Sequence, residues 1–318
     1  MKICIVSLHT EEVADLAQHT CRNHKFYADL HGYDYIAFKG RFSFRFPPWD
    51  KLKAVETVLP KYDYVLWIDA DCLIKDIKRK LETFITGKHA GHFAMDPTDY
   101  IYANTGVFIL KNDPWSFSIL EKAWDRQAPM HEKIDSRSYS DWPFEQGPMC
   151  ELLKLDNQKN HTLGPKNILN CHPNYESDAA FIVHFMGFRH HDYSNTIARI
   201  LNHNVQTGAV NSKVECEILP KMSLVDSPIA YEKTISVRHA DISGSIFFTI
   251  RKNGVLSFQY TLPTGRNLSH AFKFNESICN FNSNPTGMCM VPEKFSLYHS
   301  YEWYGETNFQ FVDTISLI

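Results

Sequence analysis

Hydrophobic positions in the first two thirds of the chain follow two alternating patterns. Apolar runs of strand length occur at residues 2–8, 33–38, 62–68, 106–110 and 181–186. Between these runs, apolar residues recur at helical spacing, which predicts helices after Thr10, after Pro47-Pro48, over 114–127 and after Pro143. Alternating strands and helices are typical of a mainly parallel sheet with helices on both faces. We therefore predict a Rossmann-like α/β domain over residues 1–205.

The pattern changes after Asn202. Residues 202–213 are polar and contain a glycine, which is typical of a linker. The runs that follow alternate apolar and polar positions, as strands with one buried face do. Two of them flank Asn253-Gly254, and this pair favours a tight hairpin because both positions of a type I′ turn need positive φ. The pattern predicts a small all-β, sandwich-like domain over residues 214–318.

Composition and charge are those of an ordinary globular protein. The 318 residues are 44% hydrophobic, and 33 Lys and Arg face 36 Asp and Glu, so the net charge is −3. Such a balance excludes the strongly basic surface of a duplex-binding protein. No apolar stretch approaches the roughly 18 residues of a membrane span, and the N-terminal run is too short for a secretory signal. We expect no nucleic-acid partner, no transmembrane segment and a cytoplasmic location.

The eight cysteines carry no pattern of their own. The sequence contains no CxxC and no paired metal-ligand spacing, so neither a zinc ribbon nor a disulfide framework is predicted. Buried, reduced thiols are the expectation for all eight.

Two aspartates follow the third apolar run, in the segment YDYVLWIDADCLI. Alternate residues of an extended chain point the same way, so Asp69 and Asp71 can face one point beyond the end of the strand. Open α/β sheets bind their ligands at that edge. Two carboxylates there suit Mg²⁺ or Mn²⁺, which can neutralise a diphosphate. In the structural alternative, Asp69 caps a helix and Asp71 is solvated.

Motifs of other phosphate-binding folds are absent. No GxGxxG follows the first apolar run, and GxxxxGKS occurs nowhere. Glu11 and Glu12 stand where the first helix would have to receive phosphate, and they would repel it. The charge of a phosphorylated ligand must therefore be balanced elsewhere, by a metal ion and a basic side chain.

Four motifs follow one another in order: WIDAD (67–71), NTGVFILKNDPWS (104–116), FEQGPM (144–149) and HFMGFR (184–189). In this order and spacing they resemble the galactosyl-, xylosyl- and mannosyltransferases of glycosyltransferase family 34, over roughly the first 200 residues. The resemblance implies the GT-A nucleotide-diphospho-sugar transferase fold and a nucleoside diphosphate sugar donor such as UDP-Gal, UDP-Xyl or GDP-Man. It also implies Mn²⁺ or Mg²⁺, a glycan acceptor, and retention of the anomeric configuration.

The resemblance implies a metal site formed by Asp69, Asp71 and His184, where the imidazole completes the ligand set through one ring nitrogen. Because that site is rich in oxygen and has a single imidazole, we expect Zn²⁺ to replace Mn²⁺ poorly. The structural alternative for His184 is a core histidine on a buried strand.

The donor-binding residues implied by the resemblance come from five segments. They are Ser7, His9, Thr10, Lys51, Asp69, Ala70, Asp71, Asn104, Gly187 and Arg189. Gly187 would let the backbone approach the diphosphate, and Arg189, where the family usually has Lys, would stabilise the leaving phosphate. The structural alternatives are a solvated helix face for Lys51, a turn for Asn104 and an exposed surface position for Arg189.

The implied catalytic pair is Glu145 and Gln146. It matches an acidic-Gln pair of the family, although Phe144 stands where the family has another acid. A carboxylate here would lie under the anomeric carbon and stabilise positive charge on it, while Gln146 would hold a donor hydroxyl. In the alternative, Glu145 is the first-turn acid of a helix that begins near Pro143.

These observations favour a metal-dependent, retaining glycosyltransferase with a nucleotide-sugar donor and a glycan acceptor. A sugar nucleotidyltransferase is one alternative, but that class usually has a Gly-rich basic loop where this chain has SLHTEE. A non-catalytic carbohydrate-binding protein, with the β-rich segment as the lectin, is the other. The intact Asp69, Asp71 and His184 weigh against it.

Overall fold

The computed structural model describes residues 1–220, apart from 44, 46, 97–101, 126–143 and 188–192, and from Ile229 onward it describes the strands. The described residues form two compact units. One contains the residues up to Pro220, and the other contains the strands from Ile229 onward.

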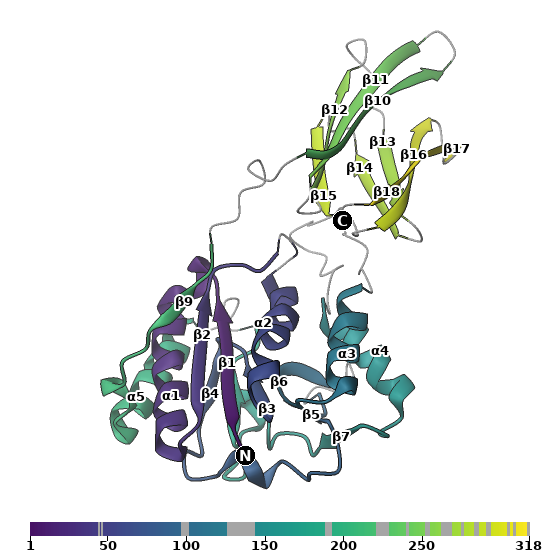
Figure 1. Ribbon diagram of the computed structural model, residues 1–318. Helices are drawn as coiled ribbons and strands as arrows, with labels where there is room; N and C mark the ends of the chain where they lie inside the picture. The colour runs from purple at the N-terminus through teal and green to yellow at the C-terminus, as the bar shows by residue number, and fades with distance from the viewer. Residues whose placement is uncertain are drawn as a thin grey trace. The chain divides into compact units, whose positions relative to one another are not determined.

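Seven strands form the central sheet of the N-terminal unit, in the order β7-β5-β6-β3-β1-β2-β9 (Figure 1). Their bounds are β1 Ile3–His9, β2 Asp34–Lys39, β3 Tyr64–Ile68, β5 Gly91–Ala94, β6 Asn104–Lys111, β7 His161–Gly164 and β9 Cys216–Ile218. In this sheet β6 runs antiparallel to its neighbours β3 and β5, and every other neighbouring pair is parallel. The predicted mainly parallel sheet is therefore confirmed.

Helices cover both faces of this sheet. Their bounds are α1 Ala14–His31, α2 Asp50–Val58, α3 Pro114–Asp125, α4 Gln146–Asp156 and α5 Tyr193–Thr207. On one side α1 packs against β1 and β2, and α5 packs against α1. On the other side α2 packs against β1 and β3, and α3 and α4 continue that layer (Figure 1). The predicted α/β arrangement is confirmed.

The end of α1 shows how the sequence sets an element boundary. Gly32 has a φ of 72°, and its N–H donates to the carbonyls of Ala28 and Asp29. Glycine adopts this left-handed conformation without a steric penalty, so it ends the helix at His31 as its sequence predicts. At the other end, a 3₁₀ turn over Glu11–Val13 precedes the helix, and no side chain caps it.

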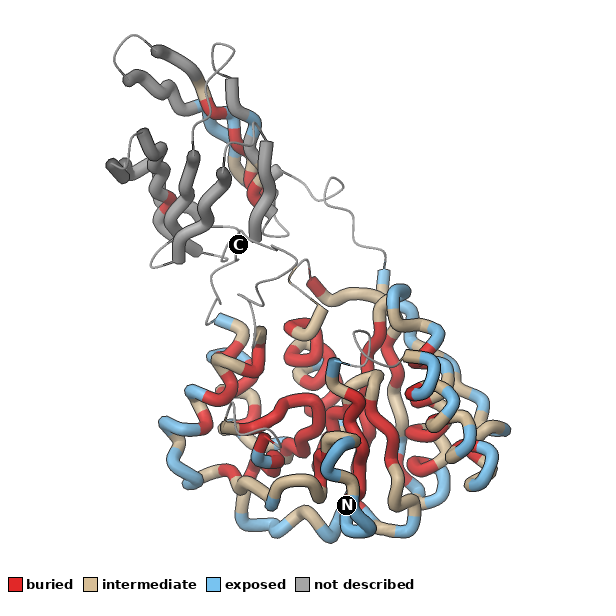
Figure 2. Tube along the Cα trace, turned by 180° about the vertical axis from the view of Figure 1, so that it is seen from behind, coloured by how far each residue is buried: buried red, intermediate tan, exposed pale blue. Residues whose placement is uncertain are grey.

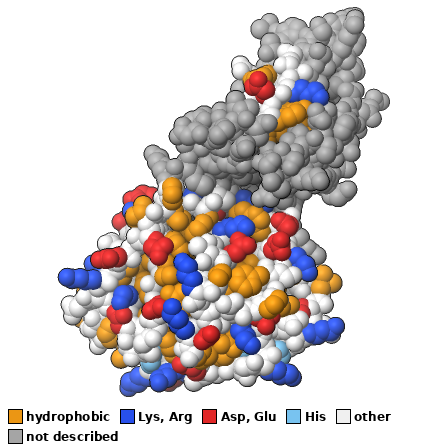
Figure 3. Space-filling view, viewed as in Figure 1, with side chains coloured by type: hydrophobic (Ala, Val, Ile, Leu, Met, Phe, Trp, Pro, Cys, Tyr) orange, Lys and Arg blue, Asp and Glu red, His pale blue; other side chains and the backbone are white. Residues whose placement is uncertain are grey.

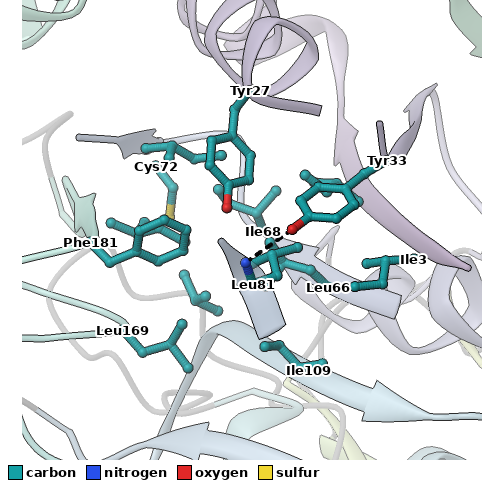
Figure 4. Close-up of a cluster of buried hydrophobic side chains, with 14 of the residues drawn as sticks. Ile3, Tyr27, Tyr33, Leu66, Ile68, Cys72, Leu81, Ile109, Leu169 and Phe181 are labelled. Atoms are coloured by element: carbon teal, nitrogen blue, oxygen red, sulfur yellow. Dashed lines mark hydrogen bonds between the residues drawn. The ribbon is translucent and has the colours of Figure 1, made fainter. Parts of the chain in front are cut away.

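The main core of the N-terminal unit lies between the sheet and α1. Ile3, Leu66, Ile68 and Ile109 project from the sheet, and Tyr27 covers them from α1 (Figure 4). All five side chains are buried. The same unit seen from behind shows buried residues concentrated in the strands and exposed ones on the outer faces of the helices (Figure 2). The apolar runs of the sequence therefore form the interior strands, because burying apolar side chains is energetically favourable.

The predicted strand at 181–186 lies outside the central sheet. It forms β8, Ile182–His184, and pairs antiparallel with β4, Cys72–Ile74, in a separate two-stranded sheet. The prediction of its strand character is thus confirmed, but the prediction that it joins the main sheet is wrong. β4 is only three residues long, too short for hydrophobic periodicity to reveal.

The predicted linker at 202–213 is also wrong over much of its length. Helix α5 continues to Thr207, and Ile197 and Ile200 of this helix pack against Leu16 and Phe185. Asn204 is buried and donates a hydrogen bond of 2.8 Å to the carbonyl of His19. The helix has one apolar stripe and a polar outer face, and the polar face dominates its composition.

Residues 216–218, which we predict as part of the β-rich segment, belong to the first unit, where β9 pairs in parallel with β2.

The second unit is entirely β in its described residues. Its first sheet contains β10 Ile229–His239, β11 Ile242–Arg251, β12 Val255–Thr261 and β15 Thr286–Met290. Its second contains β13 Ser269–Phe274, β14 Ser277–Asn282, β16 Lys294–Trp303, β17 Glu306–Thr307 and β18 Gln310–Ser316.

All pairs in both of these sheets are antiparallel, so the predicted all-β character is confirmed. The predicted hairpin joins β11 to β12, with Ile250 opposite Leu256. Asn253-Gly254 itself lies outside the described residues.

Charged side chains of both signs are interspersed on the face of the N-terminal unit shown in Figure 3. Among the helices that the structure describes, none is long and apolar enough to cross a membrane.

Candidate functional site

A pocket of about 440 Å³ opens at the C-terminal ends of β1 and β3. These strands are parallel neighbours, so their C-terminal ends meet at one edge of the sheet. Open α/β sheets bind ligands at this kind of edge. The predicted site residues that line the pocket are His9, Thr10, Lys51, Asp69, Ala70 and Asp71. The rest of the lining is the carboxylate-bearing Glu12 and six mostly apolar residues, namely Leu8, Val13, Leu16, Pro47, Pro48 and Trp67.

The first turn of α2 is anchored by Asp50, whose carboxylate is fully buried. It accepts hydrogen bonds from Arg41 Nε at 2.6 Å, from the N–H of Phe42 at 3.2 Å and from Ser43 Oγ at 2.5 Å. Burial raises the pKa of Asp50, against the lowering effect of these bonds. The anchored turn fixes the position of the next residue, Lys51.

Lys51 forms the electrostatic centre of the site. Its Nζ lies 3.0 Å from Asp69 Oδ1 and 2.8 Å from Glu145 Oε1, and it donates to the carbonyl of Thr105 at 3.2 Å. Its side chain is 5% exposed, and an ammonium has three N–H donors, so all three have protein partners. Burial opposes the charge on Lys51, but the two carboxylates outweigh it and raise the pKa of Lys51.

Glu145 and Gln146 begin α4 and meet the start of β6. Thr105 Oγ1 donates to Glu145 Oε1 at 3.0 Å, and the N–H of Thr105 donates to Gln146 Oε1 at 2.7 Å. Glu145 is 2% exposed, and burial raises its pKa against the opposing effect of Lys51. The structure therefore places this carboxylate behind Lys51, and it does not line the pocket.

Asp71, which lines the pocket, contacts the buried His184. His184 Nε2 lies 3.2 Å from Asp71 Oδ1 and 3.8 Å from Asp69 Oδ2. Burial opposes both charges, yet the two groups support one another: His184 lowers the pKa of Asp71, and Asp71 raises the pKa of His184. Of the three predicted metal ligands, Asp71 and His184 are thus in direct contact at the end of β3, and Asp69 lies farther from His184.

The tightest group of metal-ligating atoms includes a residue that the sequence did not single out. Ligand atoms of Asp71, Cys72 and His184 all lie within 4.8 Å of one another. Asp69 is outside this group, because its carboxylate pairs with Lys51 and accepts a hydrogen bond of 2.7 Å from Trp67 Nε1. The donor set of this group is one carboxylate oxygen, one imidazole nitrogen and one sulfur.

Asn104 and Gly106 shape the floor of the site. Asn104 Oδ1 accepts from the N–H of Gly106 at 2.9 Å and from Asn170 Nδ2 at 2.7 Å. A Cβ on Gly106 would lie 2.1 Å from Cε1 and 2.6 Å from Nδ1 of His184. Only a glycine leaves room there for the imidazole. Asn104 therefore serves as a buried turn residue, 6% exposed, that helps to hold this glycine.

Besides Asn104, three predicted donor-binding residues are not among the described residues that line the pocket. Ser7 is fully buried and does not line the pocket. Gly187 has a φ of 75°, a conformation that favours glycine, and a Cβ there would meet no heavy atom within 4 Å. Arg189 lies outside the described residues.

Sequence reasoning missed Trp67, Cys72, Thr105 and Gly106. Each lies within or beside a motif that the sequence does show, WIDAD or NTG, and adjacency to a motif is the signal that points to them. The partners of Thr105 and Cys72, however, are 40 and 112 positions away in the chain, and no local pattern encodes those contacts.

Comparison with known proteins agrees with the motifs. Residues 3–91 match the galactosyl transferase GMA12/MNN10 family. Xyloglucan 6-xylosyltransferase 1 of Arabidopsis thaliana is 28% identical over 130 residues, which are 35% of this chain and 28% of that protein. Probable xyloglucan 6-xylosyltransferase 5 of the same plant is 32% identical over 94 residues, 27% of this chain and 20% of the relative. The matches thus span about a quarter of the length of these relatives.

Solved structures with a similar arrangement include a glycosyltransferase involved in glycosylation of the major capsid of PBCV-1. It is 18% identical, with a TM-score of 0.49, over 64% of this chain and all of that one. The galactosyltransferase LgtC, solved with donor and acceptor sugar analogues, is 14% identical with a TM-score of 0.40, over 67% of this chain and 98% of that one. The family match agrees with the resemblance carried by the sequence motifs: residues 3–91 are similar to the galactosyl transferase GMA12/MNN10 family of glycosyltransferases.

Proposed function

We propose that this chain is a metal-dependent, retaining glycosyltransferase that moves a sugar from a nucleoside diphosphate sugar to a glycan hydroxyl. One observation carries the proposal. The pocket at the C-terminal ends of β1 and β3 is lined by Asp69, Asp71 and Lys51 together. A nucleoside diphosphate sugar needs this combination, because a cation must balance the negative charge of its phosphates and carboxylates must hold that cation in place.

The charge of the cluster supports a divalent ion. With Asp69, Asp71 and Glu145 ionised, Lys51 protonated and His184 neutral, as a metal-ligating imidazole must be, the contacting groups leave two negative charges unbalanced. Buried charges are stable only when they are paired, and a divalent cation would complete the pairing. His184 Nδ1 is also buried without a hydrogen-bond partner among the described residues. Asp71 and His184 would hold the ion, which would supply positive charge to the leaving diphosphate.

The remaining pocket residues suit a nucleoside. Leu8, Val13 and Leu16 supply an apolar wall, and Pro47 and Pro48 lie on the lining as well. Such a surface buries a flat base and the carbon face of a ribose, while a few polar groups fix their orientation. His9 and Thr10 are the polar groups at the end of β1. Burial lowers the pKa of His9, so its imidazole is neutral at pH 7 and can donate and accept one hydrogen bond.

The chain's own groups would act on the sugar in two ways. Asp69, which lines the pocket and is held by Lys51, would stabilise the positive charge that builds on the anomeric carbon as the glycosidic bond to phosphate breaks, and the buried Glu145 would act through Lys51. Gln146 accepts a hydrogen bond from the N–H of Thr105 through its oxygen, and its amide NH₂ group would hold a donor hydroxyl. Retention of configuration follows from the family resemblance and is part of this proposal.

The test uses the full chain with UDP-Gal, UDP-Xyl and GDP-Man, each with Mn²⁺ and with EDTA. We expect slow hydrolysis of at least one donor that EDTA abolishes, with the released sugar in the donor's anomeric configuration when followed by NMR. Asp71→Asn should abolish this hydrolysis, whereas Asp76→Asn, a matched change at the opposite end of β4 that affects a carboxylate paired with Arg79, should not. Hydrolysis that survives EDTA and Asp71→Asn contradicts the proposal.

A further inference from the structure

The pairing of β4 with β8 places a thiol beside the predicted metal ligands. Cys72 and His184 are directly opposite one another in this antiparallel pair. Directly opposite residues project from the same face, with Cβ atoms about 4.5–5.5 Å apart. Asp71 immediately precedes Cys72, and the ligand atoms of all three residues lie within 4.8 Å of one another.

The backbone of Cys72 is held on both sides. Its N–H donates to the carbonyl of Asp69 at 3.1 Å, and its carbonyl accepts from His24 Nε2 at 2.9 Å. Its side chain is fully buried and lies among the core side chains near Phe181 (Figure 4). The sulfur therefore occupies a fixed, water-poor position, as a preorganised ligand does.

The imidazole of His184 is equally constrained, and it lacks a partner. It is 5% exposed, and Gly106 leaves space for the ring only because it has no Cβ. Nδ1 is buried and makes no hydrogen bond with any described residue. Nε2 lies 3.2 Å from Asp71 Oδ1 and is therefore the nitrogen that faces an ion held by Asp71.

We propose that Cys72 supplies a sulfur ligand to the metal centre, which would then hold its ion through Asp71, Cys72 and His184. The inference rests on the proposed metal-dependent function and narrows the class of ion. A sulfur, an imidazole nitrogen and a single carboxylate oxygen favour Zn²⁺, Co²⁺ and Cd²⁺ over the hard ion Mg²⁺. On binding, the thiol releases its proton to solvent and forms the bond between sulfur and metal. This donor set reverses the expectation that Zn²⁺ replaces Mn²⁺ poorly.

The test is a titration of the full chain with Co²⁺, followed by absorption and without any donor or acceptor. Coordination by sulfur gives a charge-transfer band in the near ultraviolet, which oxygen and nitrogen ligands do not produce. We expect this band in the unmodified chain and its loss in Cys72→Val. Cys4→Val, the same substitution at another fully buried strand cysteine, should keep it. Circular dichroism melts of both variants show whether they fold, and Cys72→Ser provides a second, smaller replacement.

Affinity provides the second measurement. In competition with a coloured chelator, Zn²⁺ should bind the unmodified chain more tightly than Mn²⁺ does, and Cys72→Val should weaken Zn²⁺ by about tenfold or more. Co²⁺ binding without the sulfur band, or a band that Cys72→Val retains, overturns the proposal and leaves the metal-dependent function intact. If no divalent ion binds at all, both proposals fail.

Discussion

Replacing Lys51 by Met removes the ammonium at the centre of the site while keeping a side chain of similar length. Glu145 would then be a carboxylate of 2% exposure whose cationic partner is gone. Removing one partner of a buried ion pair costs about 3–5 kcal/mol, because the remaining charge is left uncompensated.

The protein can limit that cost by protonating Glu145. The free energy of this protonation gives a second estimate of the stability that Lys51→Met removes. Protonation of a carboxyl with an ordinary pKa of 4.5 at a pH of about 7.5 costs ~4 kcal/mol, at ~1.36 kcal/mol per pH unit. The two figures agree. At a pH of about 5 the same protonation costs under ~1 kcal/mol, so the penalty should nearly vanish there.

The assay is urea unfolding at both pH values, followed by tryptophan fluorescence. Most of the tryptophans lie in the N-terminal unit, namely Trp49, Trp67, Trp115 and Trp124. Lys51→Met should lose ~3–4 kcal/mol at the higher pH and much less at the lower one. The matched control is Lys53→Met in the same helix, whose ion pair with Glu56 is partly exposed and contributes at most ~1 kcal/mol.

A double variant isolates the interaction itself. Glu145→Gln combined with Lys51→Met should be more stable than the two single losses added together predict, by at least ~1 kcal/mol. If Lys51→Met behaves like Lys53→Met at both pH values, or if the two losses simply add, Lys51 does not hold Glu145 as an ion pair and the account of this network is refuted.

Three further predictions concern the surroundings of the site. Gly106→Ala should displace the imidazole of His184 and weaken Zn²⁺ or Mn²⁺ binding by about 10- to 100-fold in calorimetry. Gly164→Ala, where the new Cβ makes only ordinary contact at 3.5 Å, is its control and should leave binding unchanged. Burial lowers the pKa of His24 from 6.5 to about 4, so on acidification the unfolded chain binds a proton before the folded chain does. The free energy of unfolding should therefore fall by up to ~3 kcal/mol as the pH is lowered from 6.5 to 4. A His24→Gln variant with an unaltered pH–stability curve contradicts this. Asn23→Ala leaves two buried backbone groups of β4 without partners and should cost about 1–3 kcal/mol each in urea unfolding. A loss under ~1 kcal/mol would show that β4 does not depend on them.

Much of the fold could be predicted because its strongest signals are local. The interior strands are continuous apolar runs, and Gly32 ends α1 through its own backbone conformation. The wrong predictions have one physical cause: tertiary contacts, which the local sequence does not show, determine the structure of those segments. Most residues at the end of α5 are polar, so the sequence there resembles a linker, although the buried stripe of this helix packs against Leu16 and Phe185. The strand β8 pairs with a strand of only three residues and does not join the central sheet.

The candidate site likewise has one part that the local sequence predicts and another that depends on tertiary contacts. The sequence predicts the carboxylates at the end of β3 because strand alternation fixes their direction, and the structure places both in the pocket wall. It could not predict that Lys51 joins Asp69 to Glu145, since these three residues come from α2, β3 and α4. Nor could it predict the thiol next to His184, because the two residues are 112 positions apart and meet only through strand pairing.

The most direct test of the central claim is calorimetry of nucleotide binding to the full chain. UDP and GDP are titrated with and without a divalent ion, using Mn²⁺ and Zn²⁺ in separate series, for the unmodified chain and for Asp71→Asn. If the pocket binds a diphosphate through a metal ion, each ligand must raise the affinity of the other, by about 5- to 150-fold for an ordinary coupling. The account predicts this coupling for at least one nucleotide in the unmodified chain and its loss in Asp71→Asn. Equal nucleotide affinity with and without either ion in the unmodified chain would contradict it.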